Sequence, residues 1–254
     1  VKGDLPERID VSHAIELSEH EREEYDAFIN KITNGAGEDA LGLPHYVLLR
    51  MYCTHPNLIH HSYPELVDRE TELLEYSKFS RLITLLREVQ NRKQKAVIFT
   101  SFRRMINILC EQIPLILEHD DPLCRPQVGY IDGRNSSRAL EVIDDFGSKP
   151  GFAVLALNPK AAGTGLTITD ANHVFHYHPE WNPQLMAQAT ARVHRIGQKN
   201  EVLAHWMFCS NTIEERMMNT LEFKRELFTD AIQGVQGETD DEERLIQSLF
   251  RNEE

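Results

Sequence analysis

The chain has 254 residues, 41% of them hydrophobic and 26% charged, and its formal net charge is −13. This composition is typical of a globular protein of one large or two small domains, and it includes neither an apolar run of membrane-spanning length nor a signal-peptide pattern, so we expect no membrane contact. The acidic balance argues against a generally basic nucleic-acid-binding surface, so any contact with nucleic acid should be a local basic patch.

The first residues lack an initiator methionine, and we expect the chain to be a segment of a longer protein. Four cysteines without paired spacing indicate free thiols and an intracellular location, in the cytoplasm or nucleoid of a bacterium or the nucleus of a eukaryote. Cys53, His55, His60 and His61 lie close together, but their spacing matches no common structural-zinc pattern. We therefore predict a buried cysteine beside turn histidines, and no metal site.

The first third of the chain predicts one strand and two helices. An alternating apolar pattern over residues 9–17 predicts an edge strand. Ser18 and Glu21 form a capping-box signature that opens a helix to about Lys31. A loop with two glycines then leads to a short buried helix over residues 43–53, and two prolines make the segment after it irregular.

Helices and strands alternate regularly in the rest of the chain, beginning with an amphipathic helix over residues 78–89. Short apolar runs predict buried strands at 96–100, 127–131, 152–157, 173–177 and 202–208. The helices predicted between them are 103–117, 137–146 and one that starts at Pro183. Thr212 and Glu215 form a further capping box, which opens a long helix to about Ile232. This alternation indicates an α/β fold, a parallel sheet with helices on both faces.

Ligands of such sheets bind beyond the carboxyl ends of the strands. The predicted loops there are polar or glycine-rich and lie at 101–103, 132–136, 158–167 and 178–183. In the third loop, Gly163 and Gly165 would let a phosphate or another segment approach the backbone, and Lys160 adds a positive charge. The chain has no phosphate-binding loop of the G-x-x-x-x-G-K-[ST] type. Trp181, in the last loop, fits a packing anchor better than a surface for a partner or a nucleic acid.

The segment from Gln188 to Gln198 contains two arginines with no acid between them. Gln188, Arg192 and Arg195 are spaced by four and three residues, which on a helix places all three side chains on one face. Two adjacent guanidiniums repel each other, and their planar, permanently charged groups suit phosphate oxygens. The spacing alone fits an anion-binding pair and an ordinary solvated helix face equally well.

In their order along the chain, the segments AVIFTSF, YIDG, VLALNPKAAGTGLTITDANHVFHYHPEWNP and QATARVHRIGQ resemble the Swi/Snf family of ATP-dependent DNA translocases, in helicase superfamily two. The resemblance is to the second, C-terminal RecA-like lobe of the motor, and it covers nearly the whole chain. It implies a strand and helical protrusion over residues 1–77, the RecA-like lobe over 78–210, and a brace helix with an acidic tail over 211–254.

The resemblance also implies roles for individual residues. Arg192 and Arg195 would reach the phosphates of an ATP that a first lobe holds together with Mg²⁺, and Gln188 would order these arginines. Gly163 and Gly165 would lie in a nucleotide-binding motif that couples the nucleotide to the grip on DNA. The implied contacts to double-stranded DNA are Ser101, Arg103, Lys160 and Trp181.

Several positions depart from the family pattern. Asn158-Pro159 replaces a Ser-Thr pair, and Pro159 has no hydroxyl to donate to a DNA phosphate. Ala191 stands where an aspartate often precedes the first arginine. Leu140 occupies the position of an arginine that usually follows the Asp-Gly turn, with Arg138 nearby. Because both arginines of the last motif remain, we expect ATPase competence in the complete protein and a grip on DNA that differs from the family's.

The leading hypothesis is one half of an ATP-driven translocase on double-stranded DNA, working with an N-terminal RecA-like lobe of the same protein. Without a phosphate-binding loop and an acidic Mg²⁺ site, the chain alone should not hydrolyse ATP. The alternative is a docking module in a DNA- or RNA-polymerase-associated complex, which the acidic balance and Pro159 favour. An RNA helicase fits less well, because the arginine segment ends in Ile196-Gly197-Gln198 and not in Gly-Arg. A nucleoprotein such as RNA polymerase is a candidate target.

Overall fold

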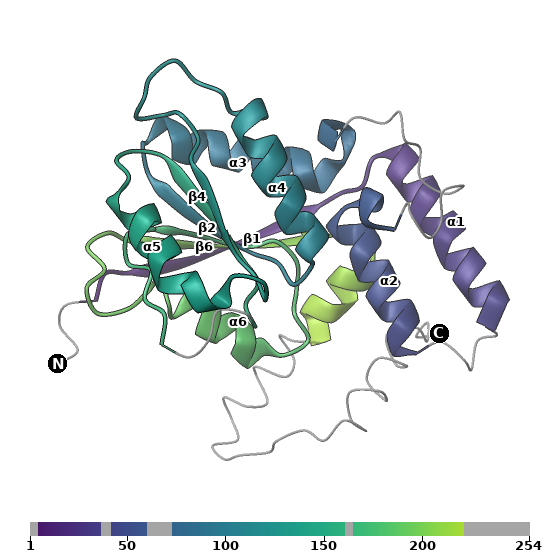
Figure 1. Cartoon of the computed structure of the whole chain (residues 1–254). Helices are drawn as coiled ribbons and strands as arrows, with labels where there is room; N and C mark the ends of the chain where they lie inside the picture. The colour runs from purple at the N-terminus through teal and green to yellow at the C-terminus, as the bar shows by residue number, and fades with distance from the viewer. Residues whose placement is uncertain (1–4, 37–41, 60–72, 161–164, 221–254) are drawn as a thin grey trace, which may run out of the picture. The chain divides into compact units, whose positions relative to one another are not determined.

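The computed structural model describes residues 5–36, 42–59, 73–160 and 165–220 (Figure 1). The chain divides into two compact units. The first consists of Val1–His13 and Ser80–Met207, and the second of Ala14–Phe79 and Phe208–Glu254. The predicted glycine residue Gly163 lies outside the described residues.

The first unit is built on a six-stranded sheet in the order β1-β6-β5-β2-β4-β3. The strands are β1 (Arg8–Ile15), β2 (Lys95–Phe99), β3 (Val128–Ile131), β4 (Ala153–Leu157), β5 (His173–His176) and β6 (Val202–Cys209). The pairs β2–β4, β2–β5, β3–β4 and β5–β6 are all parallel. The structure therefore confirms the predicted parallel sheet, and it places β1 at the edge, as the alternating pattern of residues 9–17 predicted.

The connections place helices on both faces of the sheet, as predicted. The helices are α3 (Ser77–Asn91), α4 (Arg103–Ile116), α5 (Ala139–Ser148) and α6 (Pro183–Thr190). Right-handed crossovers put α3 and α4 on one face, and α5 and α6 on the other (Figure 1). From β2 the chain first moves out to β3 and back to β4, and it then crosses to β5 on the other side of β2. Ligands of parallel sheets bind where the strand order reverses in this way, so a site is expected at the carboxyl ends of β2 and β5.

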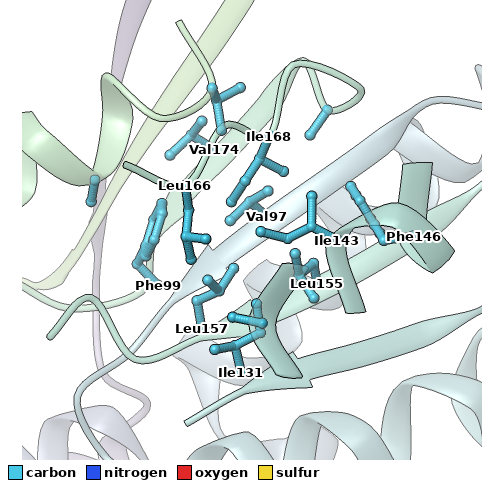
Figure 2. Packing of buried hydrophobic residues seen from close by; sticks show 14 of the residues in the cluster. Val97, Phe99, Ile131, Ile143, Phe146, Leu155, Leu157, Leu166, Ile168 and Val174 are labelled. Carbon is cyan, nitrogen blue, oxygen red and sulfur yellow. The ribbon is translucent and has the colours of Figure 1, made fainter. Parts of the chain in front are cut away.

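A buried apolar cluster fills the space between the sheet and α5. Figure 2 shows Ile143 and Phe146 of α5 directed toward strand residues such as Val97 and Leu155. The cluster also includes Val193, which is fully buried and lies within the segment that carries the two arginines. Burying an aliphatic side chain of this size stabilises the fold by about 1.5–3 kcal/mol, so Val193 anchors this segment to the core.

Three histidines in neighbouring strands form a line of hydrogen bonds, which we call the histidine relay. His13 Nε2 lies 3.0 Å from His205 Nδ1, and His205 Nε2 lies 3.2 Å from His173 Nδ1. Arg81 Nη2 approaches His13 Nδ1 at 3.5 Å, and Gln94 Oε1 lies 2.8 Å from His173 Nε2. Arginine can only donate and a carbonyl oxygen can only accept, so every proton in the relay has one consistent position when all three histidines are neutral.

The second unit contains α1 (Glu19–Ala36), α2 (Leu43–Thr54) and the short 3₁₀ turns η2 (Pro56–Leu58) and η3 (Leu73–Glu75). The predicted capping box at the start of α1 is confirmed, because Ser18 N donates to Glu21 Oε2 over 2.8 Å and Glu21 N donates to Ser18 Oγ over 3.2 Å. Helix α1 continues to Ala36, beyond the predicted end, and part of the segment predicted to be irregular forms η2.

The last described helix of this unit begins at Ile213 and is described up to residue 220, so its predicted extension to Ile232 lies outside the described residues. Thr212 Oγ1 accepts from Glu214 N over 3.1 Å, as a helix cap does, but Glu215 accepts from Asn211 N and not from Thr212 as predicted. Glu214 is completely buried and forms an ion pair of 2.6 Å with Lys78.

The described ranges contain neither a membrane-spanning helix nor a group of side chains that could hold a metal ion. None of their helices is both long and apolar enough to cross a bilayer. None of their histidines, cysteines and acids form a group of three or more that could hold a metal ion. His60 and His61 lie outside these ranges, whereas Cys53 and His55 are buried, and burial lowers the pKa of His55 to about 4.

Candidate functional site

The arginine segment lies beyond the end of a helix, which corrects the helical arrangement predicted from its spacing. Helix α6 ends at Thr190, so Arg192 and Arg195 lie in turns and only Gln188 lies in the helix. The Thr190 hydroxyl bonds to His176 Nε2 over 2.8 Å, and the backbone continues in tight turns, with Val193 N donating to Thr190 O over 3.0 Å. The helix does not continue through Arg192 and Arg195, because tertiary hydrogen bonds compete with helical ones from this point onward.

Two of these tertiary bonds come from outside the segment. The carbonyl of Arg192 accepts a hydrogen bond of 2.8 Å from Ile168 N, in the loop that precedes β5. The buried amide of Gln198 donates to Ala171 O over 2.7 Å and to Val193 O over 3.3 Å. Gly197, directly before Gln198, has a φ of 104°, a conformation that favours glycine. Together with the buried Val193, these contacts hold the arginines at the end of the sheet without helical geometry.

Arg192 is half-buried and incompletely satisfied. Its Nη2 lies 3.4 Å from the carbonyl oxygen of Pro159, in the loop after β4. Its Nη1 is buried and has no hydrogen-bond partner in the described part of the chain. Partial burial lowers the pKa of the Arg192 guanidinium, because its charge loses part of its hydration. A buried, unpartnered charged donor of this kind is costly unless an anion completes its surroundings.

The other predicted nucleotide-facing residues are more open. Arg195 is exposed, and its Nη1 donates to the hydroxyl of Thr167 over 3.3 Å. Gly165 has a φ of 104°, and no atom of the described residues outside its chain neighbours lies within 4 Å of the position that a Cβ would take. Gln188 is exposed on α6, and within the described ranges its side chain makes no hydrogen bond, so the structure does not bring it to either arginine.

The predicted DNA-facing residues all follow carboxyl ends of central strands. Ser101 and Arg103 follow β2, Lys160 follows β4 and Trp181 follows β5. Arg103 and Lys160 are exposed, whereas Ser101 and Trp181 are partly buried. Ser101 is not the N-cap of α4: that position is Phe102, and the Ser101 hydroxyl donates to Glu180.

Sequence reasoning missed three residues that surround Ser101, namely Asn158, His178 and Glu180. Asn158 directly follows β4, and the other two lie in the loop after β5. His178 is 2% exposed and Glu180 is 8% exposed, so both are buried polar groups at the end of a sheet. Their position directly after buried strands was the available signal, since polar residues there face the ligand side of a parallel sheet.

Comparison with known proteins gives the same picture. The family model of the helicase conserved C-terminal domain matches residues 77–197. The chain is 29% identical to the protein YwqA of Bacillus subtilis over 97% of its own length, and 28% identical to the DNA repair and recombination protein RAD26 of Saccharomyces cerevisiae over 89%. It spans 26% and 21% of these relatives' lengths. The SWI2/SNF2 ATPase core of Sulfolobus solfataricus in complex with double-stranded DNA is 26% identical, with a TM-score of 0.65 over 91% of this chain and 47% of that one.

The sheet order, the helices on both faces and the matched domain define a RecA-like C-terminal lobe of the helicase type. The chain belongs to the Swi2/Snf2 family of helicase superfamily two, as its motifs predicted.

Proposed function

We propose that this chain is the second motor lobe of an ATP-dependent translocase on double-stranded DNA. The observation that supports this most directly is the buried Nη1 of Arg192, which has no hydrogen-bond partner within the described ranges. In a monomeric protein, a structural arginine at this depth usually has an acid or several carbonyls around it. A phosphate oxygen would supply the missing acceptor and balance the charge.

In this proposal Arg192 and Arg195 stabilise the negative charge that spreads over the transferring phosphoryl group. An arginine in this role is worth about 10³–10⁵ in rate in other phosphoryl-transfer enzymes. The open surroundings of Gly165 would let the nucleotide or the opposing lobe approach the backbone, and we assign the same role to Gly163. Gln188 would act on the arginines only if its exposed side chain turns toward them when the lobes close.

The triphosphate and Mg²⁺ would be held mainly by the N-terminal RecA-like lobe. This chain has no phosphate-binding loop, and its described residues include no cluster of acids or histidines suited to a metal ion. Its contribution is therefore the charge of two arginines on one side of the bound nucleotide. We expect no hydrolysis by the chain alone.

Double-stranded DNA would lie along the loops that follow β2, β4 and β5. Arg103 and Lys160 are exposed there and can contact phosphates, and Trp181 offers a partly exposed ring. Such contacts do not read sequence, so binding should be non-specific and salt-dependent. A net charge of −13 favours the second candidate, a docking module for a nucleoprotein such as RNA polymerase, if these local charges prove too few.

The test is Arg195→Ala in the complete protein, with Arg87→Ala as a matched control. Arg87 is exposed on α3 and is not one of the proposed nucleotide or DNA contacts, and its removal changes the net charge by the same amount. We expect Arg195→Ala to lose at least about 10³-fold in DNA-stimulated ATP hydrolysis while duplex binding is retained. Unchanged hydrolysis in this variant would show that Arg195 does not act on the nucleotide, and it would support the docking module.

A further inference from the structure

Ser101 has no free hydrogen-bond donor. Its backbone N–H donates to His178 Nε2 over 3.1 Å, and its hydroxyl donates to a carboxylate oxygen of Glu180. Its carbonyl oxygen accepts from Asn158 Nδ2 over 3.1 Å. Three partners from the loops after β4 and β5 thus bind the three polar groups of one residue after β2. We call these four residues the Ser101 junction.

The direction of these bonds limits what Ser101 can contact. A serine hydroxyl has a single proton, and phosphate oxygens of DNA can only accept hydrogen bonds. Because Glu180 takes the hydroxyl proton and His178 takes the amide proton, nothing remains at Ser101 to donate to a phosphate. A negative carboxylate behind the hydroxyl would also repel a phosphate that approached it.

His178 fixes the proton positions within the junction. Its Nε2 accepts from the Thr100 hydroxyl as well as from the Ser101 amide, both over 3.1 Å. The ring proton therefore lies on Nδ1, which is 3.2 Å from Pro179 O and 3.4 Å from Glu180 Oε1. Since both His178 and Glu180 are more than nine-tenths buried, water competes little for these bonds and their geometry is well defined.

We propose that Asn158, His178 and Glu180 are positioning residues for the DNA track, and that Ser101 acts through them and not by contacting DNA directly. Each proposed DNA contact lies next to a member of the junction: Arg103 is two residues after Ser101, Lys160 is two after Asn158, and Trp181 follows Glu180. Lys160 is tied further, because its N–H donates to Asn158 Oδ1 over 2.9 Å. The junction makes the three loops one rigid group, so that their contacts engage DNA together.

This inference rests on the proposed function, and a double-mutant cycle between Ser101 and Glu180 in the complete protein tests it. We expect Ser101→Ala and Glu180→Ala each to raise the DNA concentration for half-maximal stimulation of hydrolysis about threefold to tenfold, as loss of one hydrogen bond of ordinary strength does. The double variant should be no worse than either single variant, because both remove the same bond. Glu180→Gln should retain most of the function, since its amide oxygen still accepts from the hydroxyl.

The control for removing a hydroxyl is Ser148→Ala, at the exposed end of α5, which should behave as wild type. If Ser101 contacts DNA directly, the fold-increases in the half-maximal DNA concentration should multiply in the double variant. That result would overturn the proposed positioning role. So would a Glu180→Gln variant as impaired as Glu180→Ala.

Hydrogen exchange in this chain tests the junction without any motor activity. The Ser101 amide should be protected in the wild type and in Glu180→Gln, and it should exchange faster in Glu180→Ala. Equal protection in all three would contradict the junction. A protected amide in a complete protein whose hydrolysis DNA does not stimulate would instead refute the proposed function and leave the junction intact.

Discussion

The histidine relay and the arginine segment are two polar regions of the same sheet, and they differ in how completely their hydrogen bonds are made. In the relay, each ring nitrogen of His13, His173 and His205 has a hydrogen-bond partner. The line ends on Arg81 at one side and on Gln94 at the other. At the arginine segment, Arg192 Nη1 is buried and has no partner among the residues that the structure describes, and the exposed Arg195 makes one hydrogen bond to them.

This difference separates groups that support the fold from groups that await a ligand. A saturated buried network gains from the low local dielectric and stabilises one arrangement of the strands. An unsaturated charged donor in the same surroundings costs stability, and a fold keeps it only where another molecule completes it. Substitutions in the two regions should therefore have opposite consequences for stability and for activity.

The largest effect is expected at Arg192. Arg192→Ala in the complete protein should lower DNA-stimulated ATP hydrolysis about 10³-fold or more, because the transferring phosphoryl group loses one of its two cations from this lobe. The same change should leave the free energy of unfolding of this chain within about 0.5 kcal/mol or raise it, since it removes a half-buried charge without an acid partner. Steady-state hydrolysis and urea unfolding measure the two quantities. A strongly destabilised variant would place Arg192 with the structural groups.

His205→Ala should show the reverse pattern. It leaves His13 Nε2 and His173 Nδ1 without partners, and it removes a ring that stacks on Phe175 with 4.3 Å between centroids. We expect a loss of about 2–4 kcal/mol in the free energy of unfolding. Replacing the exposed His119 by alanine is the control and should change stability by less than about 0.5 kcal/mol. Equal effects at the two histidines in urea unfolding would show that the relay carries no special stability.

The sequence predicted the fold more fully than it predicted the site. Continuous apolar runs identified β2 and β4, as expected for strands that are buried on both faces. The spacing of the arginine segment fits a helix, but its Arg192 O accepts from Ile168 N and its Gln198 amide donates to Ala171 O, and both bonds come from tertiary structure. No periodicity contains that information.

The Ser101 junction escaped prediction for the same reason. Ser101 precedes α4 in the sequence and satisfies the usual rule for a helix cap, but Glu180, 79 residues later, binds its hydroxyl. A local rule describes the bonds that a residue can make with its neighbours, and it fails where a distant buried carboxylate offers a stronger acceptor. The order of motifs along the chain predicted the family. The side-chain contacts within those motifs could not be predicted, because they join residues that are far apart in the sequence.

As the pH falls below about 7, the free energy of unfolding should fall because of the histidine relay, before carboxylates take up protons. Burial lowers the pKa of His173 to about 4 and that of His205 to about 3, with the charges of Arg92 and of His173 adding to the effect. The pKa of His13 is also lowered, by burial and by Arg81, although Glu88 opposes this.

Between these native values and the unfolded value near 6.5, the unfolded chain binds more protons than the native one, so the free energy of unfolding falls as pH falls. The slope should be about 1.4 kcal/mol per pH unit for each histidine that the fold keeps neutral. Thermal or urea unfolding between about pH 7 and pH 5 should show a smaller slope in His173→Gln than in the wild type, and an unchanged slope in His119→Gln. A wild-type stability that is flat over this range would mean that the relay accepts protons without penalty.

The smallest effect concerns DNA and extends the comparison to an exposed charge. Lys160 is exposed after β4, and its backbone, not its ammonium group, is tied to Asn158. If the ammonium contacts a phosphate, Lys160→Ala should weaken duplex binding uniformly across sequences and reduce the dependence of log affinity on log salt by about 1. The chain's stability should not change, because no buried bond is lost. The control is Arg87→Ala, which removes an equal charge on α3 and should leave the salt dependence of binding as in the wild type. If Lys160→Ala also shows the wild-type dependence of log affinity on log salt, the loop after β4 does not contact DNA.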